Sequence, residues 1–194
     1  MARTSELLTE RLVLRRWRDD DRLTFATMNA DPEVMRHFPE VLTRRQSDML
    51  VDRIEAGFDR HGFGPWAVEV VETGRFIGFT GLAVPGFDAH FTPAVEIGWR
   101  LARASWGHGY ASEAARRVLA FAFDEAGLDE VVSFTARTNL RSQAVMRRIG
   151  MTYDPADDFD HPLVAEGHRI RPHVLWRISA ERHSGLREQR DPCG

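Results

Sequence analysis

The sequence predicts a mixed α+β fold, with a twisted, mostly antiparallel sheet flanked by helices. Stretches with the period of a strand outnumber those with the period of a helix, and most follow one another closely enough to pair as hairpins. Residues 94–137 have the pattern of strand, helix and strand, a crossover that joins parallel strands. The 194 residues, 43% hydrophobic and 28% charged, suit one globular domain over residues 1–180, followed by a polar, frayed tail over 181–194.

The N-terminal segment predicts a strand and then a helix. Alternating residues favour a strand over 7–17. The run Asp19-Asp20-Asp21 offers caps for a helix that continues to Asn29, and Asp31-Pro32 ends it. Residues 33–41 are expected to form a loop or a short helix.

A second helix and a hairpin follow. Thr43-Arg44-Arg45-Gln46 has the pattern of a capping box and predicts a helix that runs to Arg60. Residues 65–71 and 76–84 predict paired strands joined by a turn over 72–75. Two glycines in the second of these strands indicate a bend or a close backbone approach, Gly78 and Gly81.

The most informative stretch runs from Val95 to Ala126. Apolar side chains first alternate with other residues, as in a strand, at Val95, Ile97, Trp99 and Leu101. They then recur with the period of a helix that ends near Gly127, at Ala111, Ala114, Ala115, Val118, Leu119 and Ala122. The turn between these two patterns is Trp106-Gly107-His108-Gly109-Tyr110.

The C-terminal part predicts three further strands and one helix. Strands are expected over 131–137, 151–154 and 173–179, and the segment 155–172 is expected to be a loop. Between the first two strands, Asn139 can cap a helix that continues to Ile149.

A glycine-rich turn between a strand and a helix is typical of an anion site. Glycine lets the backbone approach a ligand closely, and the first N–H groups of a helix have no partner within the helix. The turn holds no lysine and its glycines do not continue as GxGxxG, which excludes the phosphate loop of nucleotide hydrolases and the dinucleotide fingerprint. On the turn alone, a helix entry that needs glycine only for its backbone is the simpler explanation.

The segments around the turn carry a family resemblance. They are, in order, E-R-L-V-L-R-R-W, E-I-G-W-R-L, W-G-H-G-Y-A-S-E-A, F-A-F-D-E-A-G-L and N-L-R-S-Q-A-V-M-R-R-I-G. In their order and spacing the sequence resembles the GCN5-related N-acetyltransferases (GNAT), and within them the ribosomal-protein N-terminal acetyltransferases. The resemblance implies transfer of an acetyl group from acetyl-coenzyme A to an amine. It also implies that the two central parallel strands splay apart to admit the thioester arm.

The resemblance places donor binding on the central strand, the turn and the start of two helices. The residues concerned are Gly98, Trp99, Arg100, Leu101, Arg103, Trp106, Gly107, His108, Gly109, Tyr110, Ala111, Asn139 and Ser142. A backbone N–H between Gly98 and Arg100 is expected to meet the oxyanion. The family pattern Q/R-x-x-G-x-G/A is broken at Ala104, so a side-chain contact to phosphate would fall to Arg103, unless that arginine is only solvated.

Glu96 is the candidate general base. A glutamate on this strand often takes the proton of the amine in the family, usually through water, and partial burial would raise its pKa toward a useful value. The alternative is a structural carboxylate that bonds neighbouring backbone or orients the ammonium group.

Asn139 and Ser142 form a second group of candidates. By resemblance, Asn139 bonds the pantetheine arm or holds the adjoining strand, and the Ser142 hydroxyl donates to the thiolate. Many family members carry a tyrosine acid seven residues after the asparagine, where this chain has Met146. The alternative is that Asn139 caps a helix whose first turn holds Ser142.

The acceptor site is the least defined part of the sequence. Residues 155–172 contain carboxylates and histidines that would suit a cationic amine or simply a solvated loop: Asp157, Asp158, Asp160, His161, Glu166 and His168. These histidines and His173 match no standard zinc spacing, so no metal is expected. Trp66 and Phe79 are candidates to line an acceptor pocket, with the core as the alternative.

Together these features predict an acetyl-coenzyme A-dependent N-acetyltransferase that acts by direct transfer in a ternary complex. The acceptor is either a protein N-terminal amine or a small-molecule amine, and the alternative function is a noncatalytic acyl-coenzyme A-binding or sensing module. The net charge of -3 argues against nucleic-acid binding, and no apolar run suggests a membrane span or a signal peptide, so a cytoplasmic protein is expected. The family resemblance implies a monomer or a homodimer. The only cysteine, Cys193, cannot form an internal disulfide.

Overall fold

The computed structural model describes residues 6–189, which form two compact units. The first unit comprises described residues up to Ala83 together with Gly98–Val118, and the second comprises Val84–Ile97 and the described residues from Leu119 onward. Mostly antiparallel strands, one parallel pair and flanking helices confirm the predicted α+β class. The single domain over residues 1–180 stays a prediction, and Cys193 lies outside the described residues.

The strands of the first unit pair in chain order. They are β1 (Leu7–Leu8), β2 (Leu12–Arg15), β3 (Pro65–Val70), β4 (Arg75–Ala83) and the last four residues of β5 (Glu96–Leu101). The prediction of one strand over 7–17 is wrong, because the Thr9 hydroxyl bonds the backbone of Leu12 and folds β1 back onto β2. The close approach expected at Gly78 is confirmed, since a Cβ there would overlap the carbonyl oxygen of Arg100.

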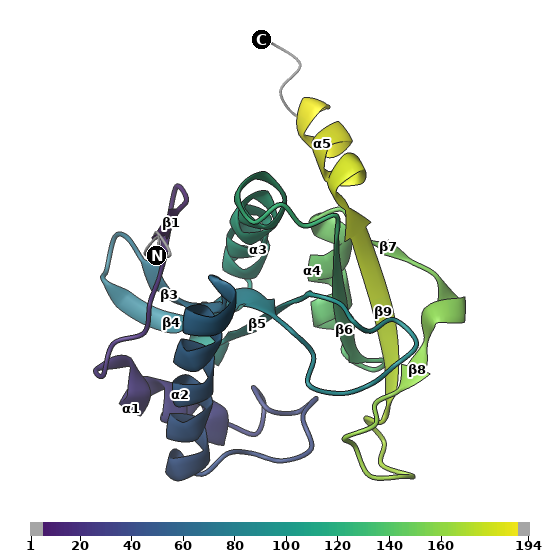
Figure 1. Ribbon diagram of the computed structural model, residues 1–194. Coiled ribbons are helices and arrows are strands. Elements are labelled where there is room, and N and C mark those ends of the chain that lie inside the picture. Colours follow the sequence, from purple (N-terminus) through teal and green to yellow (C-terminus); the bar gives the residue numbers. More distant parts are fainter. Residues whose placement is uncertain (1–5, 190–194) are drawn as a thin grey trace. The chain divides into compact units, whose positions relative to one another are not determined.

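Helices α1 (Asp21–Ala30) and α2 (Arg44–His61) belong to the first unit, as does most of α3 (Tyr110–Ala120), and α1 and α2 lie beside each other in Figure 1. The capping box of α2 is present, and its C-terminal cap Gly62 has a left-handed backbone with φ of 77°. The expected aspartate cap of α1 is wrong. Asp20 makes no side-chain cap, and the Asp21 carboxylate is instead engaged by the guanidinium of Arg15.

The pairing of Arg15 with Asp21 is a deeply buried ion pair, with each side chain only 4% exposed. Two parallel N–H···O bonds of 2.7 and 2.8 Å join the guanidinium to the carboxylate, and Nε donates to Glu69 at 2.8 Å. These bonds tie β2 to α1 and β3. Buried charges of this kind are stable only while each retains its partner.

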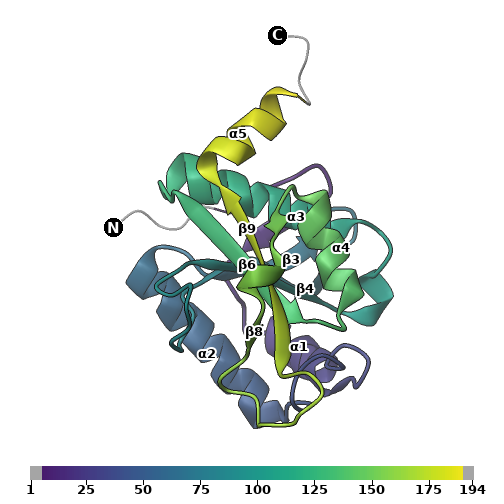
Figure 2. The ribbon, with the colours of Figure 1, turned by 90° about the vertical axis from the view of Figure 1, so that its right-hand side faces the viewer.

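The second unit is built around β6 (Glu130–Ala136) and β9 (Pro172–Ser179), which run side by side in Figure 2. The predicted parallel pairing of the crossover is confirmed at Glu96 and Val132. The Ser133 hydroxyl donates to the carbonyl oxygen of Ile97 at 2.8 Å. This side-chain bond joins β6 to β5 one residue beyond the paired Glu96 and Val132. The outer partners of β9 are β7 (Thr152–Tyr153) and β8 (Phe159–Asp160).

Several helical segments of the second unit lie between its strands in chain order. Helix α4 is Leu140–Arg148, a short 3-10 turn η3 is Pro155–Asp157, and the π-helical segment η2 is Phe121–Glu125. Segment η2 directly follows α3 (Tyr110–Ala120), and together they form the predicted helix that ends near Gly127. Because η3 and β8 lie within 155–172, the expectation that this segment is entirely loop is wrong.

The described part of the C-terminal segment is a helix, α5 (Ala180–Glu188), that extends from the end of β9 in Figure 2. The prediction of a frayed tail is therefore wrong for these residues. The Ser179 hydroxyl caps the helix by accepting from the N–H of Arg182, whose Nε donates to the carbonyl oxygen of Gly150 at 2.7 Å. Long-range contacts of this kind leave no trace in local composition.

We predict that Arg15→Met lowers the free energy of unfolding by about 3–5 kcal/mol, because the Asp21 carboxylate would remain buried without its partner. Urea unfolding followed by circular dichroism measures the change. The matched control is Arg44→Met, which removes an exposed pair with Asp48 on α2 and should cost about 0.5 kcal/mol or less. Equal losses in the two variants would contradict the role of the buried pair.

Candidate active site

The predicted glycine turn lies in the first unit, between a 3-10 turn η1 (Arg103–Ser105) and helix α3. Gly107 and Gly109 have left-handed backbones with φ of 81° and 80°, a region that side chains rarely adopt. Trp106 anchors the start of the turn by donating its indole N–H to the carbonyl oxygen of Leu101 at 2.9 Å. Glycine is therefore required here by the backbone itself.

The turn presents backbone donors that the described protein leaves unused. Within residues 6–189, the N–H groups of Gly107, His108 and Gly109 meet no hydrogen-bond acceptor. The first N–H groups of α3 follow directly, and a helix of this length carries a partial positive charge at its N-terminus. Consecutive free N–H groups at a helix start are suited to bind a phosphate or pyrophosphate.

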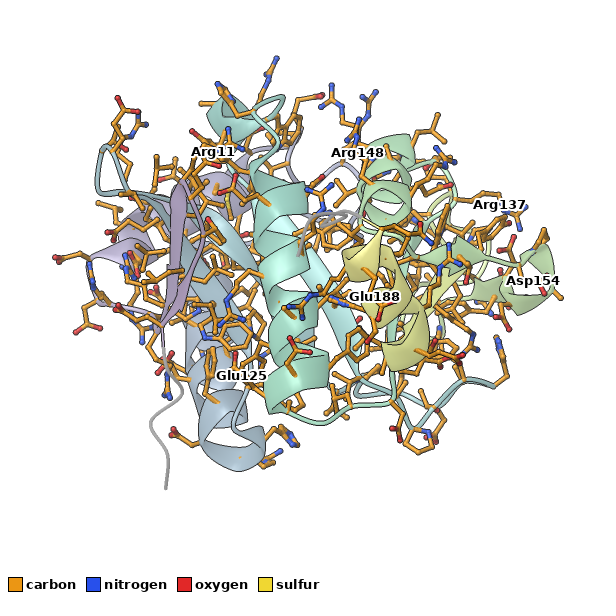
Figure 3. The ribbon with its side chains drawn as sticks, turned by 90° about the horizontal axis from the view of Figure 1, so that it is seen from above. Arg11, Glu125, Arg137, Arg148, Asp154 and Glu188 are labelled. Carbon is orange, nitrogen blue, oxygen red and sulfur yellow. The ribbon has the colours of Figure 1, made fainter. Side chains whose placement is uncertain are left out.

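Arg11 holds the turn in place, and sequence reasoning assigned it no role (Figure 3). Its Nη1 donates to the carbonyl oxygen of His108 at 3.1 Å, and its Nε donates to the Glu113 carboxylate on α3 at 2.7 Å. The guanidinium carbon also lies 4.9 Å from the centre of the Tyr110 ring. Thr9 completes the cluster by donating to Glu113 at 2.6 Å. The segment E-R-L-V-L-R-R-W was part of the family pattern, and this was the only signal that pointed to Arg11.

The other predicted donor residues of the first unit differ in where their side chains lie. Arg103 is exposed and pairs with no carboxylate among residues 6–189, so both of its expected roles stay open. Arg100 contacts α1 instead of the turn, since its Nη1 donates to the Asn29 side chain at 2.7 Å. The expected oxyanion contact through the backbone of Gly98–Arg100 stays a prediction.

Glu96 lies in the second unit at the start of β5, beside Val132 of β6. Its side chain is half-buried, and in the described chain no hydrogen bond or ion pair reaches its carboxylate. Burial raises the pKa of this carboxyl to about 7, and no neighbouring positive charge counteracts the shift. A carboxylate that bonds neighbouring backbone, one of the sequence alternatives, is therefore not what the structure shows. A carboxyl that titrates near neutral pH is suited to take a proton.

Asn139 and Ser142 also lie in the second unit, and the predicted capping contact between them is present. The Asn139 side-chain oxygen accepts from the backbone N–H of Ser142 at 3.2 Å, and its amide donates to the Thr135 hydroxyl at 2.9 Å. Asn139 thus caps α4 and ties it to the end of β6. Met146 is fully buried, and a role for Ser142 toward sulfur stays a prediction.

The acidic loop of the second unit is largely neutralised by arginines. Asp157 pairs with Arg177 at 2.7 Å, and Asp158 pairs with Arg137 at 3.1 Å. Asp160 lies 3.3 Å from the guanidinium of Arg171. This pairing disfavours the loop as a free acidic site for a cationic amine.

The histidines of the same unit pack against phenylalanine rings. His161 lies 4.6 Å from Phe87 and 4.8 Å from His173, measured between ring centres. Burial lowers the pKa of His161 to about 4, with a further contribution from His173, so the ring is neutral at pH 7. The described residues contain no group of three or more His, Cys, Asp or Glu side chains placed to hold a metal ion.

The two aromatic candidates for an acceptor pocket have different positions in the first unit. Trp66 is fully buried and packs edge-on against Phe58 at 5.3 Å, so it belongs to the core. Phe79 is half-buried, lies 5.9 Å from Phe25, and has the guanidinium of Arg100 5.4 Å from its ring centre.

No described helix is long and apolar enough to cross a membrane.

We predict that Arg11→Ala lowers the free energy of unfolding by about 1 kcal/mol and speeds hydrogen exchange in the turn around His108, because the contacts to Glu113 and His108 are lost. Chemical unfolding and hydrogen exchange measure the two effects. Arg75→Ala is the control, since Arg75 is exposed and forms no ion pair within the described chain. Exchange at the turn that is the same in both variants would refute the role of Arg11.

Comparisons with known proteins agree with this geometry. The family model of the acetyltransferase (GNAT) domain matches residues 11–152. The uncharacterized protein YkkB of Bacillus subtilis is 34% identical over 150 residues, which cover 77% of this chain and 86% of that protein. FsC-acetyl coenzyme A-N(2)-transacetylase of Aspergillus fumigatus is 42% identical over 96 residues, which cover 47% of this chain and 40% of that enzyme.

Solved structures show the same fold. A GNAT-family acetyltransferase from Bacillus anthracis matches with a TM-score of 0.76 at 24% identity, over 91% of this chain and 99% of that one. Spermidine N-acetyltransferase from Vibrio cholerae, solved with CoA and spermine, matches with a TM-score of 0.71 at 17% identity, over 91% of this chain and 99% of that one. Because the family model spans most of the chain, and because the glycine turn it contains has the expected backbone, this protein belongs to the GNAT family of acetyltransferases.

Proposed function

We propose that this protein moves an acetyl group from acetyl-coenzyme A to a primary amine, by direct transfer in a ternary complex. The observation that carries the proposal is the glycine turn, whose three consecutive free N–H groups lead into helix α3. Two similar proteins support the donor: one is named for acetyl coenzyme A, and the other was solved with CoA. The acceptor is a protein N-terminus, as in the ribosomal-protein branch, or a small-molecule amine.

The donor's pyrophosphate is the group that suits the turn. Its oxygens accept several hydrogen bonds at once, and the three N–H groups supply them without any lysine. Gly107 and Gly109 carry no Cβ, so the backbone can lie against the phosphates. A side chain at Gly109 would also adopt a strained left-handed backbone close to Arg11.

The first experiment is calorimetric titration of the wild type and Gly109→Asp with acetyl-coenzyme A. We predict that the variant binds at least about tenfold more weakly, because strain and a carboxylate both act where the pyrophosphate is proposed to lie. The matched control is Gly86→Asp, at a position with open space and no positive φ, which should bind as the wild type does. Absence of binding by the wild type would overturn the donor assignment.

The proposed chemistry begins with removal of a proton from the acceptor. Glu96 in its carboxylate form takes the proton from the ammonium group, directly or through water, and leaves the nitrogen lone pair free. The nitrogen then attacks the thioester carbonyl and forms a tetrahedral oxyanion, which a backbone N–H of β5 stabilises. Collapse breaks the C–S bond and expels the coenzyme thiolate, to which Ser142 donates a hydrogen bond, while the second proton leaves the nitrogen for the thiolate, directly or through water, to give the neutral amide and the coenzyme thiol. No cysteine lies among residues 6–189 to form an acetyl intermediate, which supports direct transfer.

The pH dependence of kcat/KM tests the base. Because burial raises the pKa of Glu96 to about 7, we predict that kcat/KM rises as the pH increases through 7, when the carboxyl loses its proton. Glu96→Gln should remove this limb and lower kcat by about 10²–10⁴-fold, while a limb from deprotonation of the amine itself persists near its own pKa. A variant with an unchanged profile would show that Glu96 is not the base.

Ser142→Ala provides the comparison within the same experiment. It removes a donor to sulfur but leaves the base in place, so kcat should fall while the limb near pH 7 and the affinity for acetyl-coenzyme A remain. Unchanged kcat would leave Ser142 as a residue of the first turn of α4 with no part in the transfer.

A further inference from the structure

Arg100 is a partly buried arginine of the first unit with which no carboxylate of the described chain pairs. Arg15, Arg16 and Arg22 each form an ion pair within the unit. Arg100 forms none among residues 6–189, although its side chain is partly buried. An unneutralised guanidinium away from full solvent is unusual, since buried charges are normally paired.

Neighbouring side chains hold the guanidinium of Arg100 in a defined position. Its carbon lies 4.1 Å from the ring centre of Phe38 and 5.4 Å from that of Phe79, within the range of cation–π attraction. Nη1 donates to the side-chain oxygen of Asn29 at 2.7 Å. Asn29 is itself fixed, because its amide donates to the hydroxyl of the buried Ser47 at 2.9 Å.

The remaining edge of the guanidinium is unused. Nε is buried and has no hydrogen-bond partner, and Nη2 likewise has none within the described chain. These two N–H groups point in parallel along one edge, the geometry that matches both oxygens of a carboxylate. A buried donor without a partner calls for an explanation, and a ligand that is bound during function would supply one for Arg100.

This edge is separate from the proposed pyrophosphate site. Within the first unit, Arg100 contacts α1 and the segment after it, through Asn29 and Phe38. The glycine turn is contacted by Arg11 of the β1–β2 hairpin and by the end of β5. The ligand of Arg100 is therefore assigned to the second substrate.

We propose that the amine acceptor carries a carboxylate, and that Arg100 binds it through Nε and Nη2. This inference rests on the proposed acetyl transfer and specifies its acceptor class: amino acids or peptides that carry an acidic side chain near the reacting amine. The aromatic rings of Phe38 and Phe79 limit hydration of the guanidinium, and the bond to Asn29 orients it. A carboxylate would satisfy the buried Nε–H that the protein leaves free.

The test uses pairs of acceptors that differ only in charge. Aspartate is compared with asparagine, and glutamate with glutamine. Each is supplied as the single residue with its α-carboxyl group converted to an amide, and as the second residue of a tripeptide amide. Acetyl transfer is followed by release of free coenzyme A. We expect the wild type to favour the acidic member of each pair by about 10–100-fold in kcat/KM, the range for a charge-assisted hydrogen-bonded contact.

Two variants separate recognition from packing. Arg100→Gln removes the charge, and Asn29→Asp supplies Arg100 with a carboxylate from within the protein at nearly constant volume. Both should bring the acid-to-amide ratio close to one, whereas Arg45→Gln, at an exposed arginine of α2, should leave the ratio unchanged. The ratio compares two substrates of one protein, so a loss of stability alone does not change it.

The outcomes are distinct. Equal use of acidic and amide acceptors by the wild type, or a preference that survives in both Arg100→Gln and Asn29→Asp, would overturn the role of Arg100 while leaving acetyl transfer intact. Tight binding of acetyl-coenzyme A without acetylation of any acceptor in the panel or of simple primary amines would instead overturn the proposed function, and the inference with it.

Discussion

The backbone conformation of the turn after β5 is the constraint on which the candidate site depends. Two left-handed glycines, Gly107 and Gly109, turn the chain so that consecutive N–H groups lack a partner within the described protein. Leaving several donors unpaired is tolerable because the turn is exposed to water, and it becomes favourable when an anion accepts them. Arg11 and Glu113 connect this turn to β2 and α3 and so reduce the conformational entropy that a ligand must otherwise remove.

Strand β5 carries two ionisable side chains whose charged forms are destabilised by desolvation. Burial raises the pKa of Glu96 to about 7 and lowers the pKa of Arg100 to about 10. Neither side chain has an opposite charge as partner in the described chain. Elsewhere the protein pairs its buried charges closely, as Arg15 does with Asp21. Unpaired, desolvated groups on one strand are the pattern expected where a protein meets a substrate.

The architecture was largely predictable because it follows from local patterns. The capping box before α2, the glycine after it and the cap of α4 by Asn139 all depend on residues within a few positions of one another. One error occurred where contacts to distant residues support the structure. The segment 181–189 looked frayed from its polarity, yet Ser179 caps it and contacts to Gly150 and Asp124 hold it as a helix. Another error came from nearby residues, since the Asp21 carboxylate accepts from Arg15 and from the backbone N–H of Arg18 instead of capping α1.

For the site, the sequence by itself determined the strand, the glycine turn and the helix, since period and positive φ are properties of neighbouring residues. It also identified Glu96 as a carboxylate of interest. Only the tertiary structure decided that Arg11 supports the turn and that Arg100 is held by Asn29, because those partners lie 97 and 71 positions apart in the chain. The tertiary structure also decided the pKa of Glu96, because burial raises it. Burial depends on the folded surroundings, which the spacing of residue types does not encode.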